Sequence, residues 1–323
     1  MKELPILERR ELDLESLPKG QTSRLRIHLV SNGMGDPIQV PVIVIKGKEK
    51  GPVMGITAAV HGNELNGLPV IYELAATIQP KKLKGTIITV PVVNIPGFLE
   101  NSRYYRDNAD LNRIFPGKAH GTASEIYAYY FMEKIAQYFE YSIDLHTASF
   151  GRINSLYVRA DLNNSVTSRM ARLQNPQIIV HKEGPDGSLR SALADRKIPS
   201  ITVEVGNPLR FQRKLIRSSL LGVLNVLRHL KMISRQEKEP KGTPILCRDS
   251  FWLYTDKGGI LEVLPDIRQM VKKGETVAFL RNVYGDIIDE YKAPEDGVVI
   301  GKSINPVGDA GSRILHLGIV DGR

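Results

Sequence analysis

The sequence contains a single cysteine, Cys247, among 323 residues. One cysteine excludes an intrachain disulfide framework and a cysteine-rich zinc module. No run of about 18 apolar residues is present, so no membrane span is expected. The first residues, MKELPILERRELDLESLP, mix charges of both signs and lack the apolar core of a secretory signal. These absences predict a soluble protein of a reducing compartment, the cytoplasm.

The basic segments lack a pattern of interleaved aromatic residues. Net charge is +9, from 44 basic and 35 acidic residues. The densest basic segments, PKKLKG (80–85) and RFQRKLIR (210–217), resemble no nucleic-acid-binding motif. We therefore expect no nucleic-acid partner. The excess of positive charge is compatible with a solvated surface or with small anionic substrates.

Strand and helix patterns alternate over residues 1–236 and predict an α/β domain. Residues 24–31 alternate polar and apolar side chains, as a half-buried strand does, and 51–60 are almost uniformly apolar. A helical spacing follows at 68–78. A strand, a helix and a further strand in this order favour a layered α/β architecture.

The pattern changes near EKEPKGTP (237–244), after which short strands and turns predominate. Residues 237–323 are therefore predicted to form a β-rich accessory domain. Its segments MVKKGETVAFL and APEDGVVIG resemble strand–turn units of lipoyl or biotinyl carriers, which favours a lipoyl-like or barrel-like fold. The connecting RNVYGD has no lysine, so a swinging-arm carrier is not expected.

Two metal-capable side chains, His61 and Glu64, follow a buried strand pattern in AAVHGNELNG (58–67). An isolated H-x-x-E pair is more often a surface or capping group, but the carboxyl edge of an open α/β sheet is a common place for sites. His146 ends the short strand pattern SIDLH, and Asp144 lies two residues earlier on the same face. Two histidines and a glutamate would supply the three protein ligands of a catalytic zinc, with Asp144 supporting His146.

The other five histidines fit a metal site less well, and we expect them to be structural. His181 and His120 are kept as reserve ligands. The remaining three lie in a strand, a helix and the β-rich region, and they are His28, His229 and His316.

A carboxylate and an arginine-rich segment could complete a hydrolytic site. Glu204 lies in the apolar strand pattern ITVEV, where a carboxylate either pairs with a cation or has a raised pKa suited to a general base. The irregular segment 101–117 carries several arginines, whose guanidinium groups bind carboxylates and stabilise oxyanions. A solvated loop with surface ion pairs is the alternative interpretation.

Four motifs in order, HGNE, DLNR-x-FPG, DLHT and VEVG, resemble the succinylglutamate desuccinylase/aspartoacylase family over roughly residues 40–235. That family is a branch of the zinc carboxypeptidase superfamily. The resemblance implies a three-layer α/β/α domain with a mixed central sheet. It also implies one zinc ion per chain, bound by His61, Glu64 and His146, with Glu204 as the general base.

The resemblance further implies a set of substrate contacts. Asn112 and Arg113 would hold the substrate α-carboxylate. Arg103 would polarise the scissile carbonyl, with Arg106 as its rival. Arg190 would contact a carboxylate on the acyl group or on the side chain.

Family members also use a tyrosine from the second domain, for which Tyr254, Tyr284 and Tyr291 all qualify. The expected function is zinc-dependent hydrolysis of the amide bond in a small anionic N-acyl amino acid. The alternative is a zinc metallocarboxypeptidase acting on peptides or cell-wall stems, and a non-catalytic binding protein is a further possibility. A homo-oligomer remains open.

Overall fold

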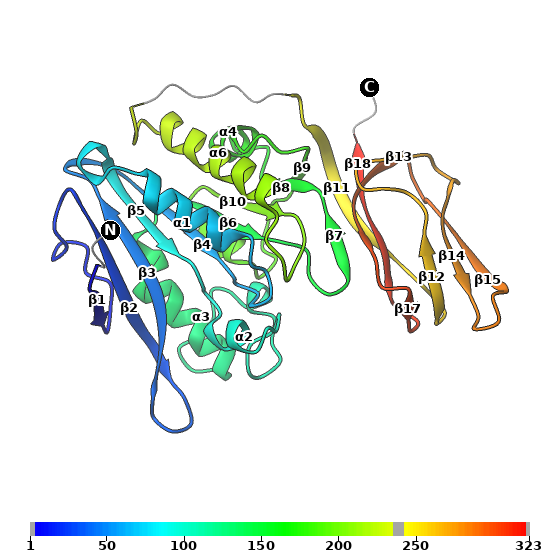
Figure 1. The fold of residues 1–323 in the computed structure, drawn as a ribbon, viewed down its shortest axis with the longest axis horizontal. Coiled ribbons are helices and arrows are strands. Elements are labelled where there is room, and N and C mark those ends of the chain that lie inside the picture. Colours follow the sequence, from blue (N-terminus) through cyan, green and yellow to red (C-terminus); the bar gives the residue numbers. More distant parts are fainter. Residues whose placement is uncertain (1–3, 235–241, 321–323) are drawn as a thin grey trace.

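The computed structural model describes residues 4–234 and 242–320, and its centre is one large mixed β-sheet (Figure 1). Strands of the first half occur in the spatial order β1-β2-β3-β5-β4-β6-β10-β8-β9. Their bounds are β1 Ile6–Arg9, β2 Gln21–Ser31, β3 Pro37–Lys46, β4 Glu49–Ala58, β5 Lys84–Val90, β6 Tyr141–His146, β8 Leu156–Ala160, β9 Ile178–His181 and β10 Ser200–Val205. Parallel pairing of β4 with β5 and β6, and of β6 with β10, makes the middle of the sheet a crossover-built α/β unit.

Helices cover both faces of this sheet and enclose two separate apolar cores. The helices are α1 Gly67–Thr77, α2 Ile95–Leu99, α3 Ala123–Lys134, α4 Ser165–Leu173, α5 Leu189–Asp195 and α6 Arg213–His229, with short 3-10 turns η1 Pro80–Lys82, η2 Leu111–Arg113 and η3 Ala136–Tyr138. One core packs α1, α4 and α6 on the sheet, and the other packs α3 and α5. Successive strand residues serve opposite cores, as Ile87 and Ile88 of β5 do. The expected three-layer α/β/α arrangement is confirmed.

Local sequence signals explain where several elements begin and end. The Thr122 side chain accepts from the Glu125 N–H while the Glu125 carboxylate accepts from the Thr122 N–H, so the predicted capping box starts α3. The segment 95–121 contains only α2 and η2 and is otherwise irregular. No helix in the described ranges is long and apolar enough to cross a membrane.

The region after residue 244 is built from strands, of which some extend the large sheet and others form a second sheet. Its strands are β11 Ile245–Tyr254, β12 Gly259–Val263, β13 Met270–Val271, β14 Thr276–Arg281, β15 Ile287–Lys292, β16 Gly297–Ser303, β17 Val307–Gly308 and β18 Arg313–Val320. β11 pairs with β9 in parallel, and β18, β16 and β13 continue the large sheet from there. The strands β15-β14-β12-β17 form a second, four-stranded sheet.

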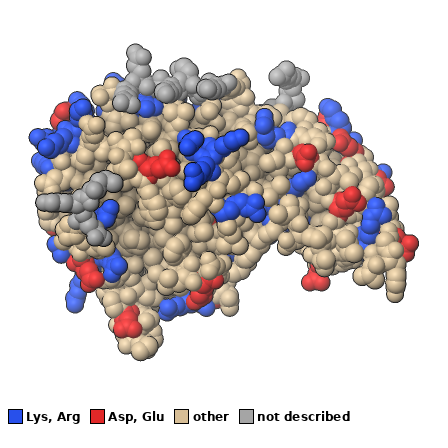
Figure 2. Space-filling model, viewed as in Figure 1, with Lys and Arg blue, Asp and Glu red and all other residues tan. Residues whose placement is uncertain are grey.

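The β-rich character of this region agrees with the sequence prediction, whereas its continuity with the large sheet was not foreseen. The short strand β7 Arg152–Asn154 also pairs with β16, which ties the two regions together a second time. The predicted boundary at 236/237 lies in residues 235–241, outside the described ranges. On the face shown in Figure 2, Lys and Arg side chains lie in separate groups with Asp and Glu between them.

Candidate active site

The main cavity lies at the carboxyl edge of the parallel strands and has a volume of about 420 Å³. β4, β6 and β10 run parallel in register, with Ala58 beside Leu145 and His146 beside Glu204. Residues at or just beyond the ends of these strands therefore meet at one edge. The cavity wall includes His61, Glu64, His146 and Glu204 from this edge, and strands β11 and β18 contribute its far side.

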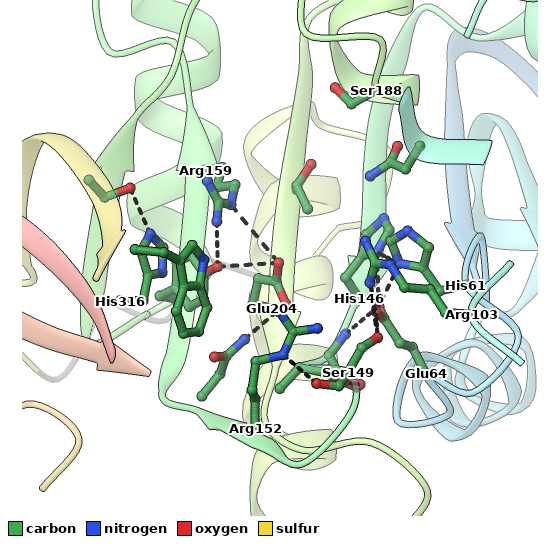
Figure 3. A pocket seen from close by; sticks show the side chains of 18 of the residues that line it. His61, Glu64, Arg103, His146, Ser149, Arg152, Arg159, Ser188, Glu204 and His316 are labelled. Carbon is green, nitrogen blue, oxygen red and sulfur yellow. Dashed lines mark hydrogen bonds and ion pairs between the residues drawn. The ribbon is translucent and has the colours of Figure 1, made fainter. Parts of the chain in front are cut away.

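His61, Glu64 and His146 converge into a candidate metal centre, as the sequence predicts (Figure 3). The three side chains are 3%, 1% and 3% exposed. His146 Nδ1 lies 3.2 Å from His61 Nδ1 and 2.9 Å from Glu64 Oε2, and His61 Nδ1 lies 2.8 Å from Glu64 Oε1. Such separations suit donor atoms that share one ion at about 2.0–2.2 Å.

Hydrogen bonds behind the two imidazoles define which ring nitrogens face the centre. His146 Nε2 donates to Asp144 at 2.6 Å, and His61 Nε2 donates to Asp110 at 3.0 Å. In a neutral imidazole the opposite nitrogen then carries a lone pair, so both Nδ1 atoms and the Glu64 carboxylate are acceptors facing one another. Three converging acceptors fit a bound cation, and the chemistry of this donor set favours zinc.

The buried carboxylates and imidazoles of this cluster shift one another's pKa values. Burial alone would lower the pKa of His146, but the Asp144 and Glu64 carboxylates raise it well above its ordinary value. Burial would raise the pKa of Glu64, yet His61 and His146 hold it well below its usual range. The Thr147 N–H at 2.9 Å and the Ser149 hydroxyl at 2.5 Å also donate to the Glu64 carboxylate.

Arg103 lies against the metal centre and is fixed there by Asp110. Its Nε and Nη2 donate to Asp110 Oδ2 at 3.1 and 2.9 Å, and its Nη1 donates to Glu64 Oε1 at 3.1 Å and to the Ser149 hydroxyl at 3.0 Å. A guanidinium has five N–H groups, so one N–H of Nη2 is left for a substrate. Arg106 is exposed and lines a different hollow with Arg26. The structure therefore places Arg103, and not its rival Arg106, in the wall of the cavity.

Glu204 occupies the middle of the cavity, between the metal centre and the His316 end (Figure 3). It accepts from the Asn154 amide and from the Tyr157 hydroxyl, each at 3.3 Å, and Arg159 Nε lies 4.0 Å away. Burial and the nearby Glu64 carboxylate raise the pKa of Glu204. The sequence allowed either a cation partner or a raised pKa for Glu204. Both are present, because the pKa of Glu204 is raised and Arg159 contacts it loosely.

The remaining predicted substrate contacts line the same cavity. Asn112 Oδ1 accepts from the Leu189 N–H at 2.9 Å, which leaves the amide nitrogen of Asn112 free to donate. Among the described residues, the Arg113 guanidinium donates only to the Asn112 carbonyl, at 2.9 Å. Arg190 is 3% exposed, and its guanidinium pairs with Asp186 at 2.9 Å.

Of the three candidate tyrosines, Tyr254 lines the cavity. Tyr284 is 88% exposed, in the turn between β14 and β15. Tyr291 donates to Asp256 at 2.6 Å on the second sheet. The structure therefore brings Tyr254 to the site and leaves the other two away from it.

The reserve histidines do not join the metal centre. His120 is exposed, and His181 belongs to a second, more open cluster with Asp161 and Glu183. His181 Nδ1 accepts from the Leu162 N–H at 3.0 Å, so in a neutral ring its Nε2 is protonated and cannot bind a metal.

Several residues that line the cavity were not predicted from the sequence. Asp110 stands in the DLNR motif itself and could have been singled out as a partner of His61. His316 was expected to be structural only, whereas it lines the cavity and stacks on Trp252 with ring centroids 5.0 Å apart. The other residues of this group are Arg152, Tyr157, Arg159, Trp252 and Arg313.

The three-layer α/β/α fold thus carries two histidines and a glutamate at its strand ends, with the partly buried Glu204 beside them, an arrangement typical of a hydrolase site. Residues 50–230, more than half of the chain, match the family described as succinylglutamate desuccinylase/aspartoacylase catalytic domain. The chain belongs to this family of deacylating hydrolases.

Relatives of known name or structure extend over most of the chain. The N-alpha-acetyl-L-2,4-diaminobutyric acid deacetylase of Halomonas elongata is 22% identical over 280 residues, which cover 82% of this chain and 81% of the relative. The product-bound ectoine utilization protein EutE (DoeB) of Ruegeria pomeroyi superposes with a TM-score of 0.84 at 22% identity, over 94% of this chain and 98% of that one. A succinylglutamate desuccinylase/aspartoacylase of Rhodobacter sphaeroides gives 0.83 at 23% identity, over 96% and 98%. These similarities to solved structures confirm the fold.

Proposed function

We propose that this enzyme hydrolyses the amide bond of a small N-acyl amino acid with one zinc ion held by His61, Glu64 and His146. The proposal rests on the convergence of three acceptor atoms in the same cavity as Glu204. Hydrogen bonds to neighbouring residues fix the direction of each of the three side chains. The deacetylase of Halomonas elongata supports the reaction type. Bound zinc would supply Lewis-acid activation of the attacking water and of the scissile carbonyl.

Glu204 is assigned the role of general base. Its carboxylate takes the proton of the attacking water as the water oxygen bonds to the acyl carbon. The carboxyl group then gives this proton to the leaving nitrogen as the carbon–nitrogen bond breaks. The products are a carboxylic acid and a free amino acid, so the water is fully accounted for.

Arg103 and the Asn112/Arg113 pair are assigned to binding and charge stabilisation. The remaining N–H of Arg103 donates to the acyl oxygen as negative charge develops on it, and Asp110 fixes the guanidinium beforehand. Asn112 and Arg113 bind the carboxylate of the amino acid. Arg190 is assigned to holding Asp186 in the cavity wall, because its guanidinium already pairs with that carboxylate.

The size of the cavity favours a small substrate over a peptide. Its volume of about 420 Å³ falls near the lower end for ligand sites. Trp252, Tyr254 and Arg313, from the C-terminal strands, form part of the wall and bound the cavity near His316. The metallocarboxypeptidase alternative is therefore the less favoured.

The test is release of free amino acid from a panel of N-acyl amino acids by wild-type protein, Glu204→Gln and Glu262→Gln. Glu262 lies on β12 and pairs loosely with Arg281 at 3.5 Å, so it provides a matched control outside the cavity. We expect Glu204→Gln to retain stoichiometric zinc and lose at least a hundredfold in kcat, with Glu262→Gln unchanged. A Glu204→Gln enzyme of wild-type rate would refute the assignment of the base.

A further inference from the structure

Among the described residues, three arginines of the cavity have no carboxylate partner: Arg113, which the proposed function assigns to the carboxylate of the amino acid, and Arg152 and Arg313. Arg103 pairs with Asp110 and Glu64, and Arg190 pairs with Asp186. Within residues 4–234 and 242–320, by contrast, no carboxylate lies within ion-pair distance of Arg152 or Arg313. The proposed reaction assigns neither of them a task.

Arg152 and Arg313, called the arginine pair below, lie on the same aromatic side chain. Each guanidinium carbon is 5.5 Å from the ring centroid of Trp252, and that of Arg313 is also 5.6 Å from the ring of Tyr254. His316 stacks on Trp252 at an interplanar angle of 9°, which fixes the plane of the indole. The two arginines come from β7 and from the start of β18, so the β16 pairings bring them together.

Their donors are oriented and still available. Arg152 Nε donates to the Ser149 carbonyl at 2.5 Å, and its Nη1 and Nη2 have no acceptor among the described residues. No hydrogen bond within the described part of the chain uses the Arg313 guanidinium either. Planar guanidinium groups held on an aromatic ring with free N–H groups are suited to bidentate binding of an oxyanion.

The positive charges around Arg152 favour an anion at this point, although Arg313 is exposed to solvent. Burial and the repulsion from Arg313 and Arg103 lower the pKa of Arg152 to about 10. Burial and three neighbouring arginines also lower the pKa of His316, so this imidazole is neutral and adds no charge. A partly buried, unpaired cation next to another one is unfavourable unless a ligand supplies the missing negative charge.

The arginine pair lies within reach of a molecule bound at the metal centre. Ser149 links the two places, because its hydroxyl donates to Glu64 while its carbonyl accepts from Arg152. Ser149, Arg152 and Arg313 line the same cavity as Glu64. Asn112 and Arg113 line it too. An N-acyl amino acid whose own carboxylate occupies Asn112 and Arg113 would leave the arginine pair free for a second charged group.

We propose that Arg152 and Arg313 form, on the indole of Trp252, an anion-binding subsite that takes a second carboxylate of the substrate. This inference rests on the proposed function, because the bound molecule is a substrate only if the enzyme hydrolyses it. Binding of a carboxylate to the subsite does not itself require turnover. The second carboxylate can stand at the end of the acyl group or on the amino-acid side chain. Both sources present the same chemistry to the arginine pair.

The binding test uses Trp252, the only tryptophan in the sequence, as its own reporter. Its fluorescence is titrated with succinate and with butyrate, which have the same chain length and differ in one carboxylate, in zinc-loaded and in chelated protein. We expect succinate to bind at least tenfold more tightly than butyrate in both forms. Arg313→Gln and Arg152→Gln should each reduce this preference about tenfold, as loss of one charge-assisted contact implies.

Arg281→Gln is the matched control, because Arg281 lies on β14 and pairs with Glu262 outside the cavity. It should leave the preference for succinate as in the wild type. Equal binding of succinate and butyrate, or equal behaviour of Arg313→Gln and Arg281→Gln, would overturn the proposal. Arg313→Lys keeps the positive charge but loses the planar guanidinium that can bind a carboxylate through two N–H groups. It therefore separates the effect of charge from that of bidentate geometry.

Kinetics then identify the source of the second carboxylate. N-succinylalanine is compared with N-butyrylalanine for the acyl end, and N-acetylaspartate with N-acetylasparagine for the side chain. Whichever pair shows a preference that collapses in Arg313→Gln identifies the group bound by the arginine pair. Tight succinate binding without hydrolysis of any compound would sustain the subsite and reject the deacylase assignment, so the two failures are distinguishable.

Discussion

Replacing Asp110 by asparagine should weaken zinc binding and disturb Arg103 at the same time. Asp110 Oδ1 accepts from His61 Nε2 at 3.0 Å, and Asp110 Oδ2 accepts from Arg103 Nε and Nη2 at 3.1 and 2.9 Å. An asparagine must turn its NH₂ group toward one of these two donors. One orientation loses the fork that fixes Arg103, and the other removes the acceptor that keeps the His61 Nδ1 lone pair toward the metal centre.

The magnitude follows from the role of such supporting carboxylates. Their loss generally costs about 10–100-fold in metal affinity, equivalent to about 1.4–2.7 kcal/mol. The burial of His61, at 3% exposed, leaves no solvent to replace the lost acceptor, so we expect a value in the upper half of this range. The assay is a competition titration of zinc between the protein and a chromophoric chelator, followed by kcat on the best substrate.

Asp107→Asn provides the control, because Asp107 lies in the same loop but accepts from the Ser124 backbone and hydroxyl at the start of α3. Its zinc affinity should equal that of the wild type. If Asp110→Asn also binds zinc and turns over substrate like the wild type, the proposed orientation of His61 is wrong.

Three further changes test other parts of the account. Arg113→Gln should raise KM at least tenfold with a smaller effect on kcat, while Arg106→Gln, outside the cavity, should leave both unchanged in the same initial-rate assay. Gly62→Ala should lower the free energy of unfolding by about 1–3 kcal/mol in urea denaturation, because its Cβ would collide with the backbone of α2, whereas Gly33→Ala has open space and should be neutral. Thr122→Ala should cost about 1 kcal/mol in the same denaturation assay through loss of the capping box, and a wild-type midpoint would contradict that role.

The convergence of His61, Glu64 and His146 could be predicted from sequence because these residues lie at or near the ends of recognisable strands. His61 follows β4 and His146 ends β6, and the carboxyl ends of neighbouring parallel strands meet at one edge. The spacing of Asp144 and His146 also placed both on one strand face, which the 2.6 Å hydrogen bond confirms.

The far wall of the cavity could not be predicted in this way. Arg152, Trp252 and Arg313 lie in strands that are distant in sequence, and their approach depends on which strands pair. Alternation of polar and apolar residues identifies a strand but not its neighbour. For the same reason the sequence does not reveal that β11 pairs with β9 in parallel and continues the large sheet.

The choice between Arg103 and Arg106 shows a different limit. Both lie in an irregular segment without a helical or strand period that would define the direction of a side chain. The ion pair with Asp110 turns Arg103 into the cavity, and the local sequence pattern does not predict that contact.

The most direct test of the central claim is the rate of amino-acid release as zinc is added back to chelated protein. Zinc bound by His61, Glu64 and His146 predicts that activity rises linearly and stops at one equivalent of zinc per chain. Full activity in the chelated protein, or no activity at any zinc level with every N-acyl amino acid of the panel, would contradict the account.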